Sequence, residues 1–320
     1  MTDLPNSMRA AAIDRFGGPE LLTIHELPVP TVDAGEVLIA LDFAGVGSWD
    51  PVVRTGDYPD YGQRFPLALG VDGAGTVAAI GAGVERFKIG DRVYSYSWDN
   101  PKGGFYAEYV AVDADRVGLV PEGLDLQQAG AIATTGLTAL QGIDDALGVK
   151  QGMSVIVHGA SGAVGTLAVQ FAKLRGARVF AKASGEDGVA LVRRLGADAA
   201  VDGRRQDILA AAREFAPGGV DAALAGGEGL ERCLDALRPG GRCAYPEWVD
   251  NPLPQERPAI GIVPYDGLPA PREYEELGRA ITAAKLQVPI AATYSLEDAA
   301  KAHERIAAGH VLGKVVLRIR

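Results

Sequence analysis

The chain has 320 residues, 48% of them hydrophobic, and a formal net charge of −10 at pH 7. This length can bury one large or two medium cores, and the acidic balance gives no basis for binding nucleic acid or an anionic membrane. No apolar run approaches the roughly 18 residues of a membrane-spanning helix, and the N-terminus has no secretion-signal pattern, which favours a cytoplasmic protein. The two cysteines, Cys233 and Cys243, exclude a disulfide framework and are expected to be small buried side chains.

Short strands separated by turns dominate the first part of the chain, to about residue 126. After a loose leader at residues 1–7, strands are expected at residues 8–13, 37–43, 75–80 and 90–96. Many short strands without regular helices indicate a compact, β-barrel-like domain. One short helix is predicted at residues 48–54, where Pro51 suits the first turn and Arg54 lies four residues beyond Asp50. Asp50 is expected to cap the N-terminus of this helix, and the alternative is a catalytic role.

A glycine-rich turn organises the second part of the chain. Residues 155–165 are Val-Ile-Val-His-Gly-Ala-Ser-Gly-Ala-Val-Gly, a buried strand that leads into a helix, and Gly176 is placed to end that helix. In such a turn a pyrophosphate approaches bare backbone N–H groups at the positive end of the helix. The expected cofactor contacts are Gly159, Ala160, Ser161, Gly162, Ala163, Val164 and Gly165. The alternative is a tight turn that binds nothing, but a second strand at residues 177–183, at βαβ spacing, favours a dinucleotide site.

Strands and helices alternate through the rest of this part. A helix is expected at residues 126–142, with a continuation at 144–147. The later strands are expected at residues 177–183, 198–201, 220–225, 241–245 and 259–263, and the helices at 184–195, 206–215 and 228–237. The start Ser184-Gly-Glu-Asp187 resembles a capping box, and a proline-rich loop is expected at residues 252–258. Repeated βα units predict a parallel, doubly wound sheet. The tail adds a helix at residues 272–285, a capped helix from 295–298 and a closing strand at 314–318.

Several motifs occur in the order of a known family. They lie at residues 45–50, 54–58, 69–77, 104–110, 135–140, 155–165, 195–198, 237–241 and 313–317. With these motifs the sequence resembles the quinone oxidoreductase (zeta-crystallin-like) branch of the zinc-independent medium-chain dehydrogenase/reductase superfamily. The resemblance implies an α/β protein with a Rossmann doubly wound parallel sheet and a GroES-like β-rich catalytic domain. Residues 1–126 would form the catalytic domain, residues 127–264 the Rossmann NADP-binding domain, and residues 265–320 a tail that returns to the catalytic domain, with the active site in the cleft between the domains.

The sequence predicts that no metal is bound. Zinc-dependent members of the superfamily carry Cys where this chain has Gly47 and Gly-His-Glu where it has Gly70-Val-Asp72, and they add a four-cysteine lobe that this chain lacks. The four histidines are scattered over different elements, while zinc needs converging thiolate, imidazole or carboxylate ligands. Without a Lewis acid, reduction of an activated acceptor is better supported than oxidation of an ordinary alcohol.

The resemblance also implies the catalytic residues. Tyr58 and Gly47 would line the substrate side of the cleft, and Thr138 would lie beside the nicotinamide. Many relatives carry Asn where this chain has Gly47. Two roles are considered for Tyr58: a catalytic residue, or a half-buried aromatic with its hydroxyl in water. The expected function is an NADPH-dependent reductase of a small-molecule quinone or carbonyl-conjugated double bond. The alternatives are an enoyl reductase that acts on a thioester and a non-catalytic, crystallin-like NADPH-binding protein.

NADPH is favoured over NADH by the end of the second strand. An NAD-specific site places an acid there, about 20 residues after the glycines, but this chain has no acid until Glu186 and offers Lys182 and Ser184 instead. Arg204 is expected to assist, because relatives often carry a Lys and a Tyr where this chain has Gly188 and Gly203. The remaining expected cofactor contacts are Ala225, Tyr245 and Lys314. A homodimer is expected through an edge strand near Val263.

Overall fold

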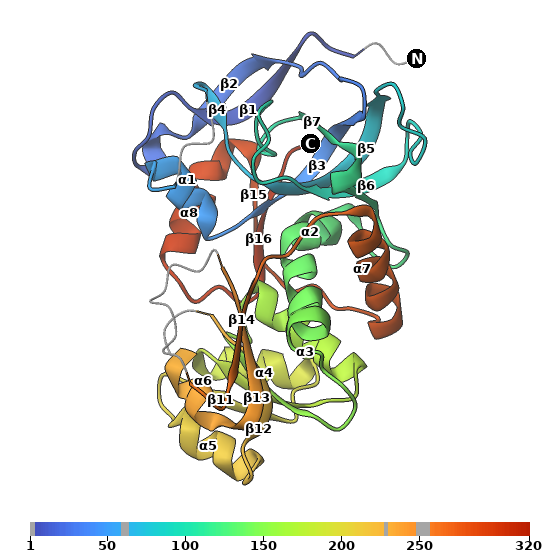
Figure 1. Ribbon diagram of the computed structural model, residues 1–320. Coiled ribbons are helices and arrows are strands. Elements are labelled where there is room, and N and C mark those ends of the chain that lie inside the picture. Colours follow the sequence, from blue (N-terminus) through green and yellow to red (C-terminus); the bar gives the residue numbers. More distant parts are fainter. Residues whose placement is uncertain (1–3, 59–63, 227–229, 248–256) are drawn as a thin grey trace. The chain divides into compact units, whose positions relative to one another are not determined.

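The computed structural model describes residues 4–58, 64–226, 230–247 and 257–320 (Figure 1). The chain forms two compact units. Unit 1 comprises residues 1–134, 269–278 and 290–320, and unit 2 comprises residues 135–268 and 279–289. The domain boundary expected at residue 127 therefore lies inside unit 1, and residues 265–268 and 279–289 of the expected tail belong to unit 2.

The sheet of unit 2 has six parallel strands in the order β11-β10-β9-β12-β13-β14. The strands are β9 (Ser154–His158), β10 (Arg178–Ala183), β11 (Ala199–Asp202), β12 (Val220–Leu224), β13 (Leu237–Pro246) and β14 (Gly261–Tyr265). Numbered within the unit, the order is 3-2-1-4-5-6, the order of a dinucleotide-binding doubly wound sheet. Every residue of β9 is buried, as expected for a central strand covered on both faces. The predicted Rossmann sheet is confirmed.

Helices connect these strands. They are α3 (Ala163–Leu174), α4 (Gly185–Arg194), α5 (Ile208–Phe215) and α6 (Leu230–Ala236), and α2 (Leu126–Gln141) enters from unit 1 and ends in a π-helical turn at Gly142–Ala146. Gly176 takes a φ of 77° just after α3, which confirms the predicted stop. The predicted capping box at Ser184 is wrong, because Ser184 flanks α4 without a side-chain capping bond. Cys233 and Cys243 are buried and free, and burial raises the pKa of Cys233 to about 12.

Unit 1 is built on two sheets. One has the order β2-β1-β4 and the other β15-β16-β3-β5-β6-β8, with β7 paired to β3. The strands are β1 (Ser7–Ile13), β2 (Thr23–Pro28), β3 (Glu36–Val46), β4 (Leu67–Ala68), β5 (Asp72–Ile80), β6 (Arg92–Tyr96), β7 (Tyr109–Asp113), β8 (Val117–Leu119), β15 (Ile290–Ser295) and β16 (Lys314–Arg318). The predicted closing strand, β16, pairs antiparallel with β3. Hydrophobic side chains from the early strands and from the tail therefore share one core.

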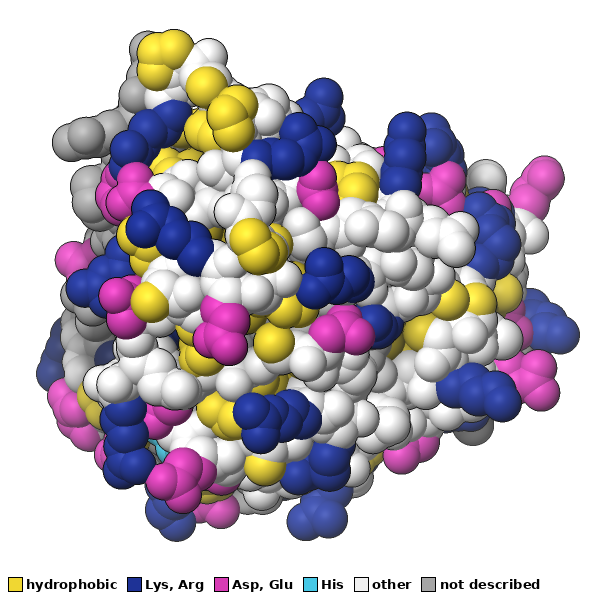
Figure 2. Space-filling view, turned by 90° about the horizontal axis from the view of Figure 1, so that it is seen from below, with side chains coloured by type: hydrophobic (Ala, Val, Ile, Leu, Met, Phe, Trp, Pro, Cys, Tyr) yellow, Lys and Arg dark blue, Asp and Glu magenta, His cyan; other side chains and the backbone are white. Residues whose placement is uncertain are grey.

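Three helices complete the fold. They are α1 (Trp49–Thr55), α7 (Pro271–Ala284), which runs from unit 1 into unit 2, and α8 (Ala299–Ala307). The predicted cap at residues 295–298 differs in the structure: Ser295 donates to the Asp298 carboxylate at 3.2 Å instead of capping the backbone. In the described ranges, no helix is both long and apolar enough to cross a bilayer. Figure 2 shows cationic and anionic side chains interspersed over one face.

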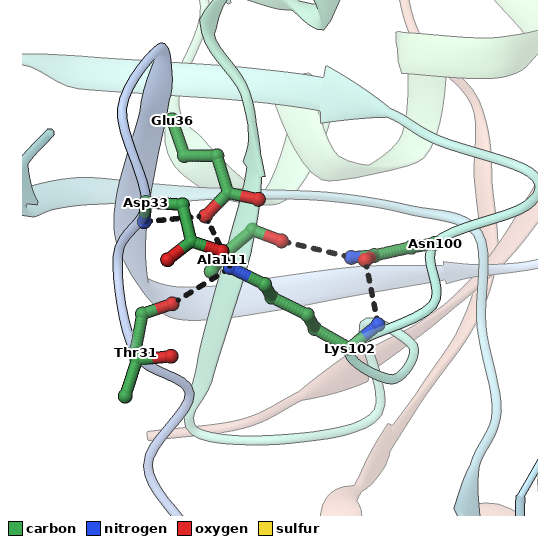
Figure 3. A network of polar contacts seen from close by, with 6 residues as sticks. All are labelled: Thr31, Asp33, Glu36, Asn100, Lys102 and Ala111. Atoms are coloured by element: carbon green, nitrogen blue, oxygen red, sulfur yellow. Dashed lines mark hydrogen bonds and ion pairs between the residues drawn. The ribbon is translucent and has the colours of Figure 1, made fainter.

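One lysine ties two loops of unit 1 together (Figure 3). Lys102 Nζ donates to the Thr31 carbonyl at 3.0 Å and to Asp33 Oδ2 at 2.7 Å, and it also contacts the Glu36 carboxylate. Burial lowers the pKa of Lys102, but the hydrogen bonds to the two carboxylates outweigh it, so the pKa is raised overall. The loop at residues 31–36 is thereby held against the loop that carries Lys102.

Candidate functional site

The glycine turn of unit 2 presents open backbone at the start of α3. Gly159 follows β9 with a φ of 65°, a conformation that favours glycine. A Cβ on Gly165 would lie 2.3 Å from the Gly159 carbonyl oxygen, so helix and turn approach too closely for any side chain. A Cβ on Gly159 would meet no described atom within 4 Å, so the outer side of the turn is free. This arrangement fits a pyrophosphate.

The other residues of the turn complete that surface. Gly162 flanks α3 without a side-chain cap, so the first N–H groups of the helix are left for a ligand. Ala163 and Val164 are partly exposed there. Ala160 donates its N–H to the Lys182 carbonyl at 2.9 Å, and the buried Ser161 accepts from Ser184 N at 3.4 Å. The turn is thus joined to the end of β10.

Lys182 lies near the end of β10, and Arg204 lies on the connection that follows β11. Lys182 is half-buried, and a Cβ on Gly203 would lie 2.1 Å from its Cε, so the lysine stem occupies the space over Gly203. Arg204 is exposed, and its guanidinium makes no hydrogen bond or ion pair with the described residues. The neighbouring Arg205 guanidinium is instead bonded to Glu186 at 2.9 Å. Arg204 is therefore the arginine available to a ligand.

An acid that the sequence argument missed ends the third strand. Asp202 Oδ1 accepts from Gly185 N and from Arg204 N, each at 3.1 Å. These hydrogen bonds hold the pKa of Asp202 below its usual value, so its carboxylate is charged at neutral pH. The residue rule for NAD specificity applies to the end of the second strand, whereas the signal for Asp202 is an aspartate directly before the Gly-Arg pair that follows the third strand.

Three further predicted residues lie in unit 2. Ala225 follows β12 and donates to the Ala244 carbonyl at 3.0 Å, and the half-buried Tyr245 is near the end of β13. Because the strands are parallel, both lie at the same sheet edge as the glycine turn. Thr138 is buried in α2, its carbonyl accepts from Tyr265 Oη at 2.9 Å, and a Cβ on Gly267 would lie 2.7 Å from its Oγ1. Residues 265–267 therefore pack directly over Thr138.

A buried carboxylate follows Gly47 in unit 1. Asp50 Oδ2 accepts from Gly47 N at 2.7 Å and from Tyr106 Oη at 2.8 Å. The predicted role of Asp50 as the N-terminal cap of α1 is wrong, because Asp50 lies inside the helix and Ser48 is the flanking residue. Burial raises the pKa of Asp50 to about 7, against the Gly47 N–H and the charge of Lys314. This carboxyl group titrates near neutral pH.

Arg54 does not pair with Asp50. Its Nε donates to the Gly17 carbonyl at 3.0 Å, and its Nη1 lies 3.1 Å from His303 Nδ1. Burial and the neighbouring guanidinium lower the pKa of His303 to about 3, so the imidazole is neutral and its Nδ1 accepts the hydrogen bond. Arg54 thereby links α1 to α8 inside unit 1.

Lys314 is buried in unit 1. Its Nζ lies 3.5 Å from Asp72 Oδ2 and 4.8 Å from the centroid of the Trp49 ring. Asp72 is fully buried and accepts from Thr134 N at 3.2 Å. The charge of Lys314 is therefore engaged by an internal ion pair and a cation–π contact, and its expected contact with the cofactor stays a prediction.

Gly47 and Tyr58 border an aromatic cluster of unit 1. A Cβ on Gly47 would lie 2.1 Å from the Trp49 ring, so the indole fills the space that a side chain at this position would need. Trp98 lies 6.0 Å from Trp49 and 5.0 Å from Tyr58, measured between ring centroids. Tyr58 is partly exposed at one end of this cluster. Gly47 and Tyr58 therefore lie at the same aromatic cluster.

The residues at the positions where zinc-dependent members of the superfamily carry their ligands do not fit a zinc ion. Gly47 and Val71 carry no ligand atom, and in the part of the chain that the structure describes no group of three or more His, Cys, Asp or Glu side chains is placed to hold a metal ion. Lys314 places a positive charge beside Asp72 instead.

Known proteins resemble this chain in sequence over most of its length. Residues 33–122 match the alcohol dehydrogenase GroES-like domain, and residues 195–317 match the zinc-binding dehydrogenase family. The quinone oxidoreductase of Homo sapiens is 31% identical over 326 residues, covering 97% of each chain. The chain belongs to the quinone oxidoreductase family. It is an α/β medium-chain dehydrogenase/reductase with a GroES-like domain, as predicted.

Solved structures resemble the whole chain. An NAD-dependent alcohol dehydrogenase matches with a TM-score of 0.90 and 31% identity, over 98% of this chain and 100% of that one. A mycobacterial protein complexed with NADPH matches with a TM-score of 0.85 and 29% identity, over 98% and 100% of the two chains. The chain is therefore an oxidoreductase of a nicotinamide-dependent superfamily.

Proposed function

We propose that this quinone oxidoreductase family member is an NADPH-dependent reductase that acts on a quinone or on a carbonyl-conjugated double bond, without zinc. The observation that carries the proposal is the open glycine turn beside the end of β10, where Lys182 and the following Ser184 are present instead of an acid. The similarity to a mycobacterial protein complexed with NADPH supports the same cofactor, and the similarity to an NAD-dependent enzyme makes NADH the necessary comparison.

The residues of unit 2 would hold the cofactor. The first N–H groups of α3 and the turn at Gly159–Gly162 would bind the pyrophosphate. Lys182 and Arg204 would supply positive charge, and Ser184 a hydrogen-bond donor, to the 2′-phosphate. When bound, NADPH supplies a hydride to the electron-poor carbon of the acceptor, and a proton from solvent completes the two-electron reduction.

Oxyanion stabilisation would fall to side-chain hydroxyls. Gly47 donates its N–H to Asp50, and the Trp49 ring fills the space that a side chain at position 47 would need, so Gly47 supplies no free hydrogen-bond donor. Tyr58 and Thr138 are the remaining predicted catalytic residues, and both carry hydroxyl groups that can donate to a developing oxyanion. Reduction of an activated acceptor needs only such a donor, whereas oxidation of an ordinary alcohol needs a Lewis acid that promotes loss of the hydroxyl proton.

Steady-state kinetics test the activity. With a panel of small quinones and an enone, NADPH is expected to exceed NADH by at least about tenfold in kcat/KM, which is roughly 1.4 kcal/mol. Equal use of the two cofactors would refute the cofactor assignment. Turnover confined to a coenzyme-A thioester at low concentration would favour the enoyl reductase alternative. Tight NADPH binding with no turnover on any acceptor would favour a non-catalytic role.

Two matched substitutions test the phosphate contacts. Lys182→Ala and Arg204→Ala are each expected to erode the NADPH preference, mainly by raising the KM for NADPH. Arg213→Ala is the control, because Arg213 is an exposed residue in the last turn of α5. An equal loss of preference in the Arg213 variant would point to a general effect of net charge instead of a specific site.

The absence of zinc is proposed from the missing ligands at Gly47 and Val71. Metal analysis of protein purified without chelators is expected to find well under one zinc per chain. Stoichiometric zinc, together with loss of activity on chelation, would overturn this part of the proposal.

A homodimer is proposed through β14. This strand lies at the edge of the unit 2 sheet, beyond β13, and Val263 is in its middle. Such an edge can pair with the same strand of a second copy across a two-fold axis. Sedimentation is expected to show a dimer at micromolar concentration, and a monomer alone would count against it.

A further inference from the structure

Asp202 lies where two strand–helix connections of unit 2 meet. It is the last residue of β11 and pairs in register with Ala183 of β10. It is 6% exposed, and its own N–H donates to Gln206 Oε1 at 2.9 Å. Its carboxylate is thus fixed beside the end of the second strand, although the third strand supplies it.

One carboxylate oxygen joins the two connections that carry the proposed phosphate contacts. Oδ1 of Asp202 accepts from Gly185 N, directly after Ser184, and from Arg204 N. Ser184 N in turn contacts Ser161 Oγ in the glycine turn at 3.4 Å. Hydrogen bonds to a charged acceptor are stronger than those between neutral groups, and because one carboxylate oxygen accepts both, Asp202 ties the two connections together.

The charge of Asp202 acts against its positioning effect. A carboxylate close to a 2′-phosphate repels it. The two N–H donors offset part of this charge, and Arg205 Nε lies 3.9 Å from Oδ2. An asparagine keeps an oxygen that can accept from both N–H groups and removes the charge, so it separates the two effects.

We infer that Asp202 is a positioning residue for cofactor selectivity: by accepting from Gly185 and Arg204 it holds Ser184 and Arg204 together as one recognition site for a ribose 2′-phosphate. The inference rests on the proposed use of NADPH. In the usual pattern the residue that selects between NAD and NADP lies at the end of the second strand. Asp202 lies at the end of the third strand and acts through the hydrogen bonds that it accepts.

Binding measurements on the full chain test this inference without any acceptor. Calorimetry gives the Kd of NADPH, NADH and 2′,5′-ADP for the unmodified protein and for Asp202→Ala, Asp202→Asn and Asp207→Ala. Asp202→Ala is expected to raise the Kd of NADPH and 2′,5′-ADP about tenfold and that of NADH less than about threefold. Asp202→Asn is expected to bind NADPH at least as tightly as the unmodified protein.

Asp207→Ala is the matched control. Asp207 also accepts from two backbone N–H groups, those of Leu209 and Ala210, but it caps α5 on the exposed surface. Its loss is expected to lower thermal stability and leave the ratio of the NADPH and NADH dissociation constants unchanged. Circular dichroism establishes that each variant is folded before its affinities are compared.

The possible outcomes separate the inference from the proposed function. Failure of the unmodified protein to prefer NADPH would remove the proposed cofactor. An unmodified protein that prefers NADPH, with an unchanged ratio in folded Asp202→Ala, would overturn the role of Asp202 alone. If Asp202→Ala and Asp202→Asn lose the preference for NADPH over NADH equally, the hydrogen bonds that Asp202 accepts do not position the site. If Asp202→Ala does not fold, Asp202→Asn still decides, because a tenfold weaker Kd for NADPH in that variant contradicts the inference.

Discussion

The buried Asp50 carboxyl is expected to make the stability of unit 1 depend on pH. Its side chain is 1% exposed, and burial raises its pKa from 3.8 to about 7. In the unfolded chain it returns to its ordinary value, so between these two values the folded protein binds a proton that the unfolded protein does not. The stabilisation associated with the proton is fully present below the unfolded pKa and is lost as the pH rises through the folded pKa.

The magnitude follows from the difference between the two pKa values. About three pKa units at 1.36 kcal/mol each give roughly 4 kcal/mol of unfolding free energy lost from about pH 4 to above pH 7. Asp50→Asn keeps an oxygen for the Gly47 and Tyr106 hydrogen bonds and cannot ionise. Its unfolding free energy relative to the unmodified protein is therefore expected to rise by about 1 kcal/mol or more per pH unit across this range.

Urea unfolding followed by tryptophan fluorescence measures this difference. Trp49 and Trp98 both lie in unit 1 near Asp50, so they report its unfolding. Other titrating groups cancel when the two proteins are compared at each pH. Asp115→Asn is the control, because its side chain is 74% exposed. Its unfolding free energy is expected to change with pH in parallel with that of the unmodified protein. If the unfolding free energy of Asp50→Asn also changes in parallel with that of the unmodified protein, burial does not raise the pKa of Asp50 as proposed.

Three other substitutions test close contacts. Gly165→Ala would place a Cβ 2.3 Å from the Gly159 oxygen, so it is expected to abolish dinucleotide binding in calorimetry and to cost about 1–3 kcal/mol of unfolding free energy. Gly47→Asn meets the Trp49 ring and is expected to destabilise alone, but by less than the additive sum when combined with Trp49→Ala in a double-mutant cycle. Lys102→Ala removes the bonds to two carboxylates and a carbonyl and is expected to cost about 1–2 kcal/mol in urea unfolding.

Matched controls separate these effects from general ones. Gly162→Ala would place its Cβ 3.3 Å from the Gly159 oxygen, a far milder approach than the 2.3 Å at Gly165, so it is expected to cost less unfolding free energy than Gly165→Ala. Lys88→Ala, at a side chain that is 86% exposed, is expected to change stability by less than about 0.5 kcal/mol. A Gly165→Ala variant that is stable and binds the cofactor would contradict the close approach at Gly165. Additive losses of unfolding free energy for Gly47→Asn and Trp49→Ala would contradict the contact between these two residues. Equal losses for Lys102→Ala and Lys88→Ala would contradict the role of the Lys102 contacts.

The order of strands and helices in unit 2 and the closing strand β16 were predictable from the sequence. Apolar periodicity and glycine spacing are local signals, since a strand buried on both faces and a helix beginning at a glycine turn each leave a short pattern. Gly159, Gly165 and Gly176 were recognisable for the same reason, because their backbone conformation or close packing excludes other residues.

The partners of the polar side chains were decided by the tertiary structure. Sequence spacing predicted that Asp50 caps a helix and that Ser184 opens a capping box, and both predictions were wrong. Asp50 instead meets Tyr106, and Gly185 meets Asp202, across separate elements. A carboxylate bonds to whichever donor the packing of the core brings within about 3 Å. That choice depends on how distant segments fold together, which no local pattern encodes.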